Sequence, residues 1–225
     1  MTRRLALAAL CAAPFNVSCR SAQKPAAQAT ISLPAPQRSG AVSVEETLLK
    51  RRSIRQYKNQ PLSLAEVAQL LWAAQGTTNE AGGRTAPSAG ALYPLEVYAV
   101  VGNVKDLEPG VYKYLTREHR LRQVAASDRR AELAAAALGQ QQIAQGPVTF
   151  VFSGVYERTA KRYKERAVRY VHMEAGHAAQ NICLQAVALG LGSVVMGAFE
   201  DDRVKRVVGM PDEEAGLYLV TVGRP

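Results

Sequence analysis

The sequence predicts an α+β fold in which a mixed, mainly antiparallel sheet is flanked by helices. Two strongly apolar runs, 95–101 and 148–155, have the length and composition of buried strands. Strands and helices do not alternate in the regular order that a parallel sheet requires, which favours antiparallel pairing. With 225 residues, 48% of them hydrophobic, the chain is long enough to bury one well-packed domain.

The first 19 residues are typical of an export signal. Arg3 and Arg4 precede the apolar run 5–15, which is too short to cross a bilayer. The arginine pair fits a twin-arginine signal, and it fits the basic start of an ordinary Sec signal equally well. We expect an exported protein, periplasmic or in the cell envelope, with Cys19 as a candidate lipid-anchor site. A cytoplasmic protein whose start is assigned too early is the alternative.

Residues 20–42, rich in Ala, Gln, Pro and Ser, predict a flexible tether, so the folded domain is expected over 43–225. Residues 1–44 carry five cations and no acid, and they contribute over half of the formal charge of +9. The remaining 23 basic and 19 acidic side chains leave a net charge of +4, and no basic run is interleaved with stacking aromatics. Nucleic acid is therefore not an expected partner.

Capping residues predict the first two helices. Ser43 and Glu46 have the spacing of a capping box ahead of a short helix. Ser63 and Glu66 repeat that spacing ahead of a longer amphipathic helix, which should end at Gly76.

The middle of the chain predicts a hairpin over 111–124, followed by a helix that starts at Ser127 or Asp128 and ends near residue 138. The charged segment 156–170 is expected to be partly helical. A long helix should then cover 169–189.

The last part of the chain predicts a strand from residue 193, a helix over 202–208 and a final strand over 217–222. Small residues on the long 169–189 helix would let another helix approach closely, and a core helix buried in its own chain explains them as well. These residues are Ala175, Gly176, Ala178 and Ala179.

A basic stretch follows the first helix. If its backbone is extended, Arg51, Ser53 and Arg55 point to one side and Ile54 points to the other, where it can anchor in apolar surface. Two guanidinium groups beside a hydroxyl suit a phosphate or a carbonyl-rich ring edge. A solvated basic turn at the end of a helix is the alternative.

The polar, Gly-rich loop over 76–94 is the second candidate site. A loop of this length inside a compact domain is usually functional or disordered. Its small residues around Ser88 and Ala89 allow the backbone to approach a flat ligand closely. A plain surface loop remains the other interpretation.

Several other chemistries find no support. His172 and His177 lie five residues apart, which on a helix directs their imidazoles about 140° from each other, so no metal site is expected. The chain has no P-loop, no dinucleotide fingerprint and no serine or cysteine nucleophile signature. Cys183 is expected to be a small buried hydrophobe.

The order of the R-x-S-x-R stretch, the Pro-Ser loop, the Ala-rich helix and the Gly-Leu-Gly strand resembles the nitroreductase superfamily of FMN enzymes. Within it, segments 87–94, 110–121 and 174–181 resemble the SagB-type azoline dehydrogenases. The resemblance covers about 43–225. It implies a homodimer with FMN at the subunit interface and a ping-pong oxidoreductase that transfers hydride through flavin N5.

The resemblance also implies roles for one group of residues near the flavin. Arg51 and Ser53 would hold the FMN phosphate and ribityl chain, and Arg55 would reach the N1/C2 edge of the ring. The backbone at Met196 and Gly197 would lie near N5.

A second group would complete the flavin site. Pro87, Ser88 and Ala89 would meet the flavin from the partner subunit. Arg224 resembles a C-terminal phosphate contact, without the tail that usually follows it.

Azoline dehydrogenases resemble one another in a Lys-Tyr pair, which Arg162-Tyr163 matches best. Tyr163 is the candidate proton donor, while Arg162 stays protonated and would be a poor base. The expected substrate is a small molecule or a peptide, with NAD(P)H as a candidate electron donor. Alternatives are a non-catalytic flavin-binding or assembly protein, and a general NAD(P)H-dependent nitro or quinone reductase.

Overall fold

The computed structural model describes residues 30–225, so the predicted export signal, Cys19 and the first part of the tether lie outside the described residues. Its sheet has seven strands in the order β1-β6-β5-β3-β7-β9-β8, and every pairing between them is antiparallel. A separate two-stranded parallel pair joins β2 to β4. The predicted α+β fold with a mainly antiparallel sheet is confirmed.

The elements follow the expected order. The strands are β1 (Thr30–Ser32), β2 (Leu62–Ser63), β3 (Leu95–Val101), β4 (Val104–Lys105), β5 (Gly110–Leu115), β6 (Arg120–Ala125), β7 (Val148–Gly154), β8 (Gly192–Met196) and β9 (Ala215–Gly223). The helices are α1 (Val44–Lys50), α2 (Leu64–Gln75), α3 (Arg130–Ala136), α4 (Gln141–Gln145), α5 (Tyr156–Tyr163), α6 (Ala167–Ala188) and α7 (Asp201–Val208), with 3₁₀ turns η1 (Ala89–Ala91) and η2 (Lys164–Arg166).

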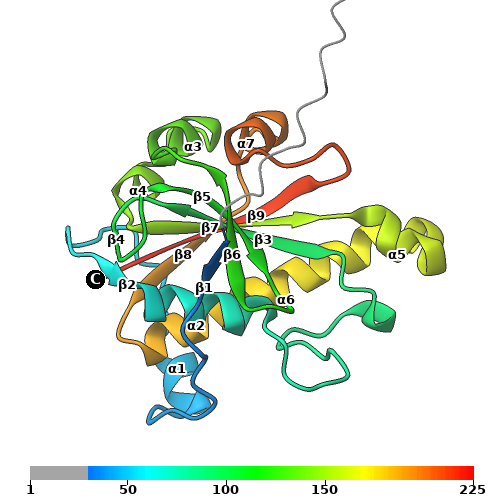
Figure 1. Ribbon diagram of the computed structural model, residues 1–225, viewed down its shortest axis with the longest axis horizontal. Coiled ribbons are helices and arrows are strands. Elements are labelled where there is room, and N and C mark those ends of the chain that lie inside the picture. Colours follow the sequence, from blue (N-terminus) through cyan, green and yellow to red (C-terminus); the bar gives the residue numbers. More distant parts are fainter. Residues whose placement is uncertain (1–29) are drawn as a thin grey trace, which may run out of the picture.

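Helices cover both faces of the sheet. Figure 1 shows α1, α2 and α6 on one side and α3, α4 and α7 on the other. The buried side chains accordingly form two clusters, one under each set of helices. The sheet separates the two clusters, and every residue of its interior strand β7 is buried. This three-layer arrangement leaves β8 at one edge of the sheet.

The predicted helix caps are present. The Ser63 hydroxyl accepts a hydrogen bond from the Glu66 amide, and the Glu66 carboxylate accepts one from the Ser63 amide, which completes a capping box at α2. At α1 only half of the predicted capping box forms: the Ser43 hydroxyl accepts from the Glu46 amide at 3.2 Å, while the Glu46 carboxylate pairs with Lys50. Helix α3 is shorter than expected, because Leu138 and Gly139 adopt left-handed backbone angles just after it.

The tether prediction is wrong for residues 30–42. Thr30–Ser32 pair with β6 on the sheet edge. Leu33 is buried beside them, and the His119 Nε2 atom lies 2.9 Å from the Pro34 carbonyl oxygen. Alternating side chains in a short Thr-Ile-Ser-Leu run can cover an open strand edge, and the surrounding Ala, Pro and Gln hid that signal. The folded part of the chain therefore includes Thr30 and does not begin near Ser43.

Helix α6 buries most of its small residues inside its own chain. Ala175, Ala178 and Ala179 face the core, where α6 packs against α2. Gly176 remains exposed. The interpretation of a buried core helix is thus confirmed for the three alanines. In residues 30–225 no helix is long and apolar enough to span a membrane.

Candidate functional site

The basic stretch lies along the open edge of β8. Ser53 forms a parallel bridge with Ser193, and the Ile54 amide donates to the Ser193 carbonyl at 2.9 Å. The Ile54 side chain packs on Gly192, where an added Cβ would come within 2.8 Å of it. The predicted anchoring of Ile54 is confirmed, and glycine at 192 is what allows this close approach.

Two guanidinium groups beside Ser53 are free to bind an anion. Across the described part of the chain, Arg51 and Arg55 make no side-chain hydrogen bond and no ion pair. Arg52 differs, because its Nη1 donates to the carbonyls of Leu49 at 2.9 Å and Arg51 at 2.7 Å. Arg51 and Arg55 are therefore the unpartnered cations of this stretch, as a phosphate site requires.

Cys183 lies on α6, close to Ser193 and to Arg51 of the basic stretch. Burial raises the pKa of its thiol, while a hydrogen bond with Ser193 and the charge of Arg51 oppose that shift. The expected buried cysteine is confirmed. A thiol whose pKa is raised is not an activated nucleophile.

The far end of β8 carries the turn at Met196 and Gly197. Met196 is buried and Gly197 is exposed. Two side chains at the start of α4 hold this turn, because the Gln140 side-chain amide donates to the Ala198 carbonyl at 2.9 Å and the Gln142 side-chain amide donates to the Met196 sulfur at 3.3 Å. The turn and the basic stretch thus lie along the same sheet edge.

The C-terminal arginine reaches the same region from β9. Gly223 pairs with Gly192, the first residue of β8. The Arg224 guanidinium donates to the Glu66 carboxylate. The backbone carbonyl oxygen of Arg224 accepts from the Lys58 amide at 2.9 Å. A cleft of about 580 Å³ is lined by residues 53–58 and Pro225.

The Pro-Ser loop is held at another place on α6. The Ala89 amide donates to the Glu174 carboxylate at 2.9 Å, and the Ser88 hydroxyl accepts from the Tyr93 amide at 2.9 Å. Pro87, at the start of the loop, is exposed. Glu174 was not identified from the sequence, although an acidic residue on the apolar face of α6 was a usable signal.

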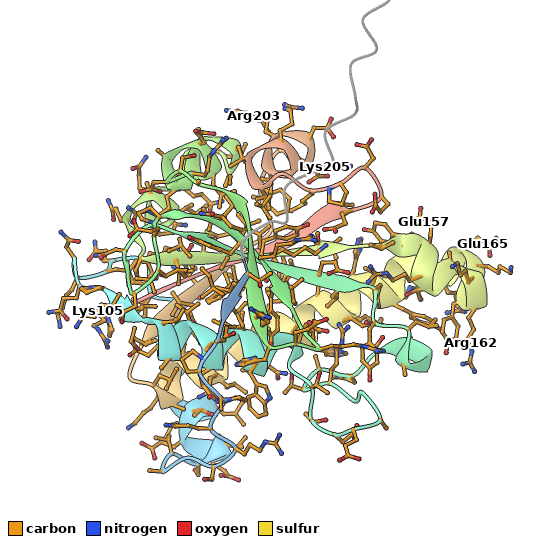
Figure 2. All side chains as sticks on the ribbon, viewed as in Figure 1. Lys105, Glu157, Arg162, Glu165, Arg203 and Lys205 are labelled. Carbon is orange, nitrogen blue, oxygen red and sulfur yellow. The ribbon has the colours of Figure 1, made fainter. Side chains whose placement is uncertain are left out.

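Tyr163 lies against this loop. A Cβ placed on Gly90 would lie 3.0 Å from the Tyr163 hydroxyl and 3.1 Å from an Arg162 guanidinium nitrogen. The Tyr163 ring also packs edge-on to Tyr170, with ring centroids 5.1 Å apart. Figure 2 shows Arg162 at the outer end of α5, on the side of the loop. Tyr163 is therefore next to the Pro-Ser loop of its own chain.

The predicted site residues form two groups within one chain. The first, at the β8 edge, holds Arg51, Ser53, Arg55, Met196, Gly197 and Arg224. The second, which meets α6 at Glu174, holds Pro87, Ser88, Ala89 and Tyr163. Glu174 and Cys183 are separated by about 14 Å along α6, at about 1.5 Å per residue. The fold does not merge the two groups into one cluster.

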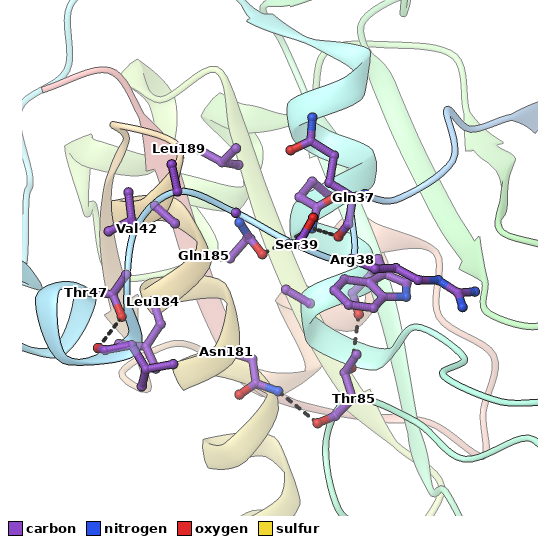
Figure 3. Close-up of a pocket in the computed structure, with 17 residues that line it drawn as sticks. Gln37, Arg38, Ser39, Val42, Thr47, Thr85, Asn181, Leu184, Gln185 and Leu189 are labelled. Carbon is purple, nitrogen blue, oxygen red and sulfur yellow. Dashed lines mark hydrogen bonds between the residues drawn. The ribbon is translucent and has the colours of Figure 1, made fainter.

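A cavity of about 420 Å³ contains none of these residues. It lies between segment 37–42 and helices α1, α2 and α6 (Figure 3). The Gln69 amide fixes the segment, because it accepts from the Gln37 amide at 2.8 Å and donates to the Gln37 carbonyl at 3.1 Å. The Asn181 amide donates to the Thr85 carbonyl at 3.3 Å across the same cavity. The sequence did not predict this cavity, since it expected a tether over 37–42.

Comparisons with known proteins agree on the family. The Nitroreductase family profile matches residues 48–224. A protein of Methanocaldococcus jannaschii described as a nitroreductase, MJ1384, is 45% identical over 183 residues, covering 81% of this chain and 91% of the relative. The Microcin B17-processing protein McbC of Escherichia coli is 27% identical over 142 residues, covering 61% of this chain and 52% of McbC.

Solved structures show the same fold. A crystal structure of an Anabaena variabilis protein described as a nitroreductase superposes with a TM-score of 0.78 at 33% identity. The match covers 88% of this chain and 42% of that one, so the present chain spans less than half of that protein. Since a family profile covers most of the chain and MJ1384 matches nearly end to end, the chain belongs to the nitroreductase family.

Proposed function

We propose that this protein is an FMN-dependent oxidoreductase. The observation that carries the proposal is the edge of β8, where Ser53 is bridged to Ser193 and two unpartnered guanidinium groups flank it. An unpaired cation next to a hydroxyl and exposed backbone fits a phosphorylated cofactor. The family assignment supports the same cofactor.

The residues present fit FMN in chemical terms. Arg51 and Ser53 would bind the phosphate and ribityl chain, and Arg55 would place positive charge near the ring. The chemistry that FMN would supply at this site is hydride transfer between two substrates in a ping-pong cycle. The exposed backbone at Gly197, next to the buried Met196, would leave room for a substrate to approach.

The proposal includes a homodimer in which each flavin contacts both chains. Two observations support it. The Pro-Ser loop and the β8 edge are separate within one chain, so a second copy is needed to bring them together. Leu48 and Leu49 on α1 are 54% and 72% exposed, and Met173 on α6 is 53% exposed, which is apolar surface typical of an interface.

A finer proposal concerns the second substrate. The likeness to McbC, named as a processing protein, and the contact of Tyr163 with Gly90 favour a SagB-type dehydrogenase that acts on a small molecule or peptide. Tyr163 would hold a proton at its hydroxyl, close to the loop that meets the flavin. Arg162 would contribute charge only, because a guanidinium does not deprotonate in proteins.

The test is cheap and separates the alternatives. Purified protein should be yellow and should release FMN on denaturation. Under anaerobic conditions, NAD(P)H should bleach it, and so should an azoline peptide if the protein oxidises azolines, because the azoline then gives its hydride to the flavin. A nitroaromatic or a quinone should accept the electrons and restore the colour. Bound flavin that never bleaches would favour a non-catalytic flavin-binding or assembly protein. Turnover with NAD(P)H and quinones alone would favour a general reductase.

We also propose export of the folded holoprotein through the twin-arginine route, on the basis of Arg3 and Arg4. The pair Arg3→Lys and Arg4→Lys preserves charge, so it should spare Sec export and block the twin-arginine route. Cell fractionation that finds the variant outside the inner membrane at wild-type levels would contradict that route. A wild-type protein found in the cytoplasm would contradict export altogether.

A further inference from the structure

Glu174 is a buried carboxyl group that the cofactor residues do not account for. Glu174 is 4% exposed and lies on the face of α6 that otherwise carries apolar side chains. Burial raises its pKa, and hydrogen bonds from Ala89 and Ser88, with weaker effects of the His177 and Arg84 charges, oppose the shift. A buried carboxyl persists only where specific donors face it.

Its donors belong to the Pro-Ser loop. The Ala89 amide donates to Glu174 Oε1 at 2.9 Å, and the neighbouring Ser88 hydroxyl helps to lower the pKa of the carboxyl group. The same Ser88 oxygen accepts from the Tyr93 amide at 2.9 Å. Glu174 and Ser88 together therefore fix both ends of the turn over 88–93.

This turn does not have an ordinary conformation. Gly90, Ala91 and Tyr93 have φ angles of 61°, 53° and 47°, in the left-handed region. The two non-glycine residues carry a steric cost there, so the surrounding contacts must maintain the shape. Arg158 on α5 supplies one such contact, because its Nη1 donates to the Tyr93 carbonyl at 3.1 Å.

The position of the turn also determines what Tyr163 meets. The Tyr163 hydroxyl approaches Gly90, where even a methyl group would be tightly placed at 3.0 Å. A shift of the turn would therefore change the surroundings of Tyr163 and, at the same time, the Ser88–Ala89 backbone.

We propose that Glu174 is a positioning residue, which holds the Ser88–Ala89 backbone in the geometry that contacts the flavin. This inference rests on the proposed function only for the flavin contact. The anchoring of the loop itself is a property of the chain alone.

Two measurements test it. In protein freed of FMN, the Ala89 amide should exchange with solvent at least about tenfold faster in Glu174→Ala than in wild type, because its buried acceptor is gone. In FMN-loaded protein, the same variant should change the visible circular dichroism of the flavin. Glu174→Gln keeps an acceptor oxygen at the same place and should restore both signals. If Glu174→Ala fails to fold, Glu174→Asp takes its place. It keeps the charge but shortens the side chain, so it should show the same faster Ala89 exchange and the same change in flavin dichroism.

Gln69→Ala is the matched control, since it also removes a buried polar side chain that holds a backbone segment, at 37–42. It should leave the Ala89 amide and the flavin dichroism unchanged. Unchanged Ala89 exchange in Glu174→Ala would overturn the proposal, as would faster exchange with an unaltered flavin spectrum. A wild type that binds no FMN would refute the proposed function, and the exchange experiment would still decide whether Glu174 anchors the loop.

Discussion

Arg224 and Glu66 join the C-terminal end of β9 to the start of α2. The Arg224 Nη2 atom donates to both carboxylate oxygens of Glu66, at 2.9 and 3.1 Å. One of those oxygens also accepts from the Ser63 amide at 2.7 Å, as part of the capping box. The arginine that the resemblance assigns to the FMN phosphate is therefore already engaged by a carboxylate.

This arrangement predicts unequal losses of stability. Glu66→Ala removes the ion pair and half of the capping box, and should lower the free energy of unfolding by about 1–2 kcal/mol. Arg224→Ala removes only a partly exposed ion pair, and should cost about 0.2–1 kcal/mol. Urea unfolding of both variants checks the order. A larger loss for Arg224→Ala would contradict it.

Replacing Lys164 by glycine should stabilise the protein. Lys164 lies between α5 and α6 with φ 49° and ψ −128°, a combination that suits glycine. Lys164→Gly should raise the free energy of unfolding by about 1 kcal/mol, because relieved strain outweighs the entropy of a more flexible unfolded chain. Lys161→Gly, inside α5, is the control and should lower it by about 1 kcal/mol. Destabilisation by both changes would show that Lys164 is not strained.

Glu174 predicts a pH dependence of stability. Burial raises its pKa above the ordinary value of 4.5. A raised pKa in the folded state means that the contribution of this group is fully present below pH 4.5 and is lost as the pH rises through the folded pKa. Glu174→Gln does not titrate, so it should gain stability relative to wild type across that window. A difference in unfolding free energy that does not vary with pH would contradict the buried, titrating carboxyl.

The exposed leucines of α1 predict the interface. Leu48→Glu with Leu49→Glu should convert the proposed dimer to a monomer, because burying two carboxylates in an apolar contact is costly. Sedimentation or light scattering reads the result. Leu138 is 64% exposed and follows α3, which Figure 1 shows on the side of the sheet opposite α1. Leu138→Glu therefore tests the same kind of substitution elsewhere and should leave the dimer intact. A wild type that is monomeric while it holds one FMN per chain would refute the shared site.

Local signals predicted most of the fold. Capping residues located α1 and α2, and apolar runs located β3 and β7, because both depend on neighbouring residues in the chain. Strand β1 escaped prediction, since three residues gain their stability from the open edge of β6 and not from their own sequence. Ala175, Ala178 and Ala179 could be placed on one helix face, but the sequence could not tell whether that face meets α2 or a second chain.

The candidate site was predicted in part. The alternation around Ile54 correctly indicated an extended segment, and the structure supplies its partner, Ser193. The pairing of Arg224 with Glu66 and of Ala89 with Glu174 joins residues far apart in the chain, which no local pattern reveals.

Titration of FMN into cofactor-free Arg51→Ala and Arg52→Ala tests the central claim most directly. The two variants lose the same charge from adjacent positions, but Arg52 is occupied by backbone carbonyls, while Arg51 is unpartnered among residues 30–225. Arg51→Ala should weaken FMN binding by about tenfold to over a hundredfold, the loss of a charge-assisted contact of about 1.5–3 kcal/mol, and Arg52→Ala should stay within about threefold of wild type. Equal affinities for wild type and Arg51→Ala would contradict the FMN site at the β8 edge.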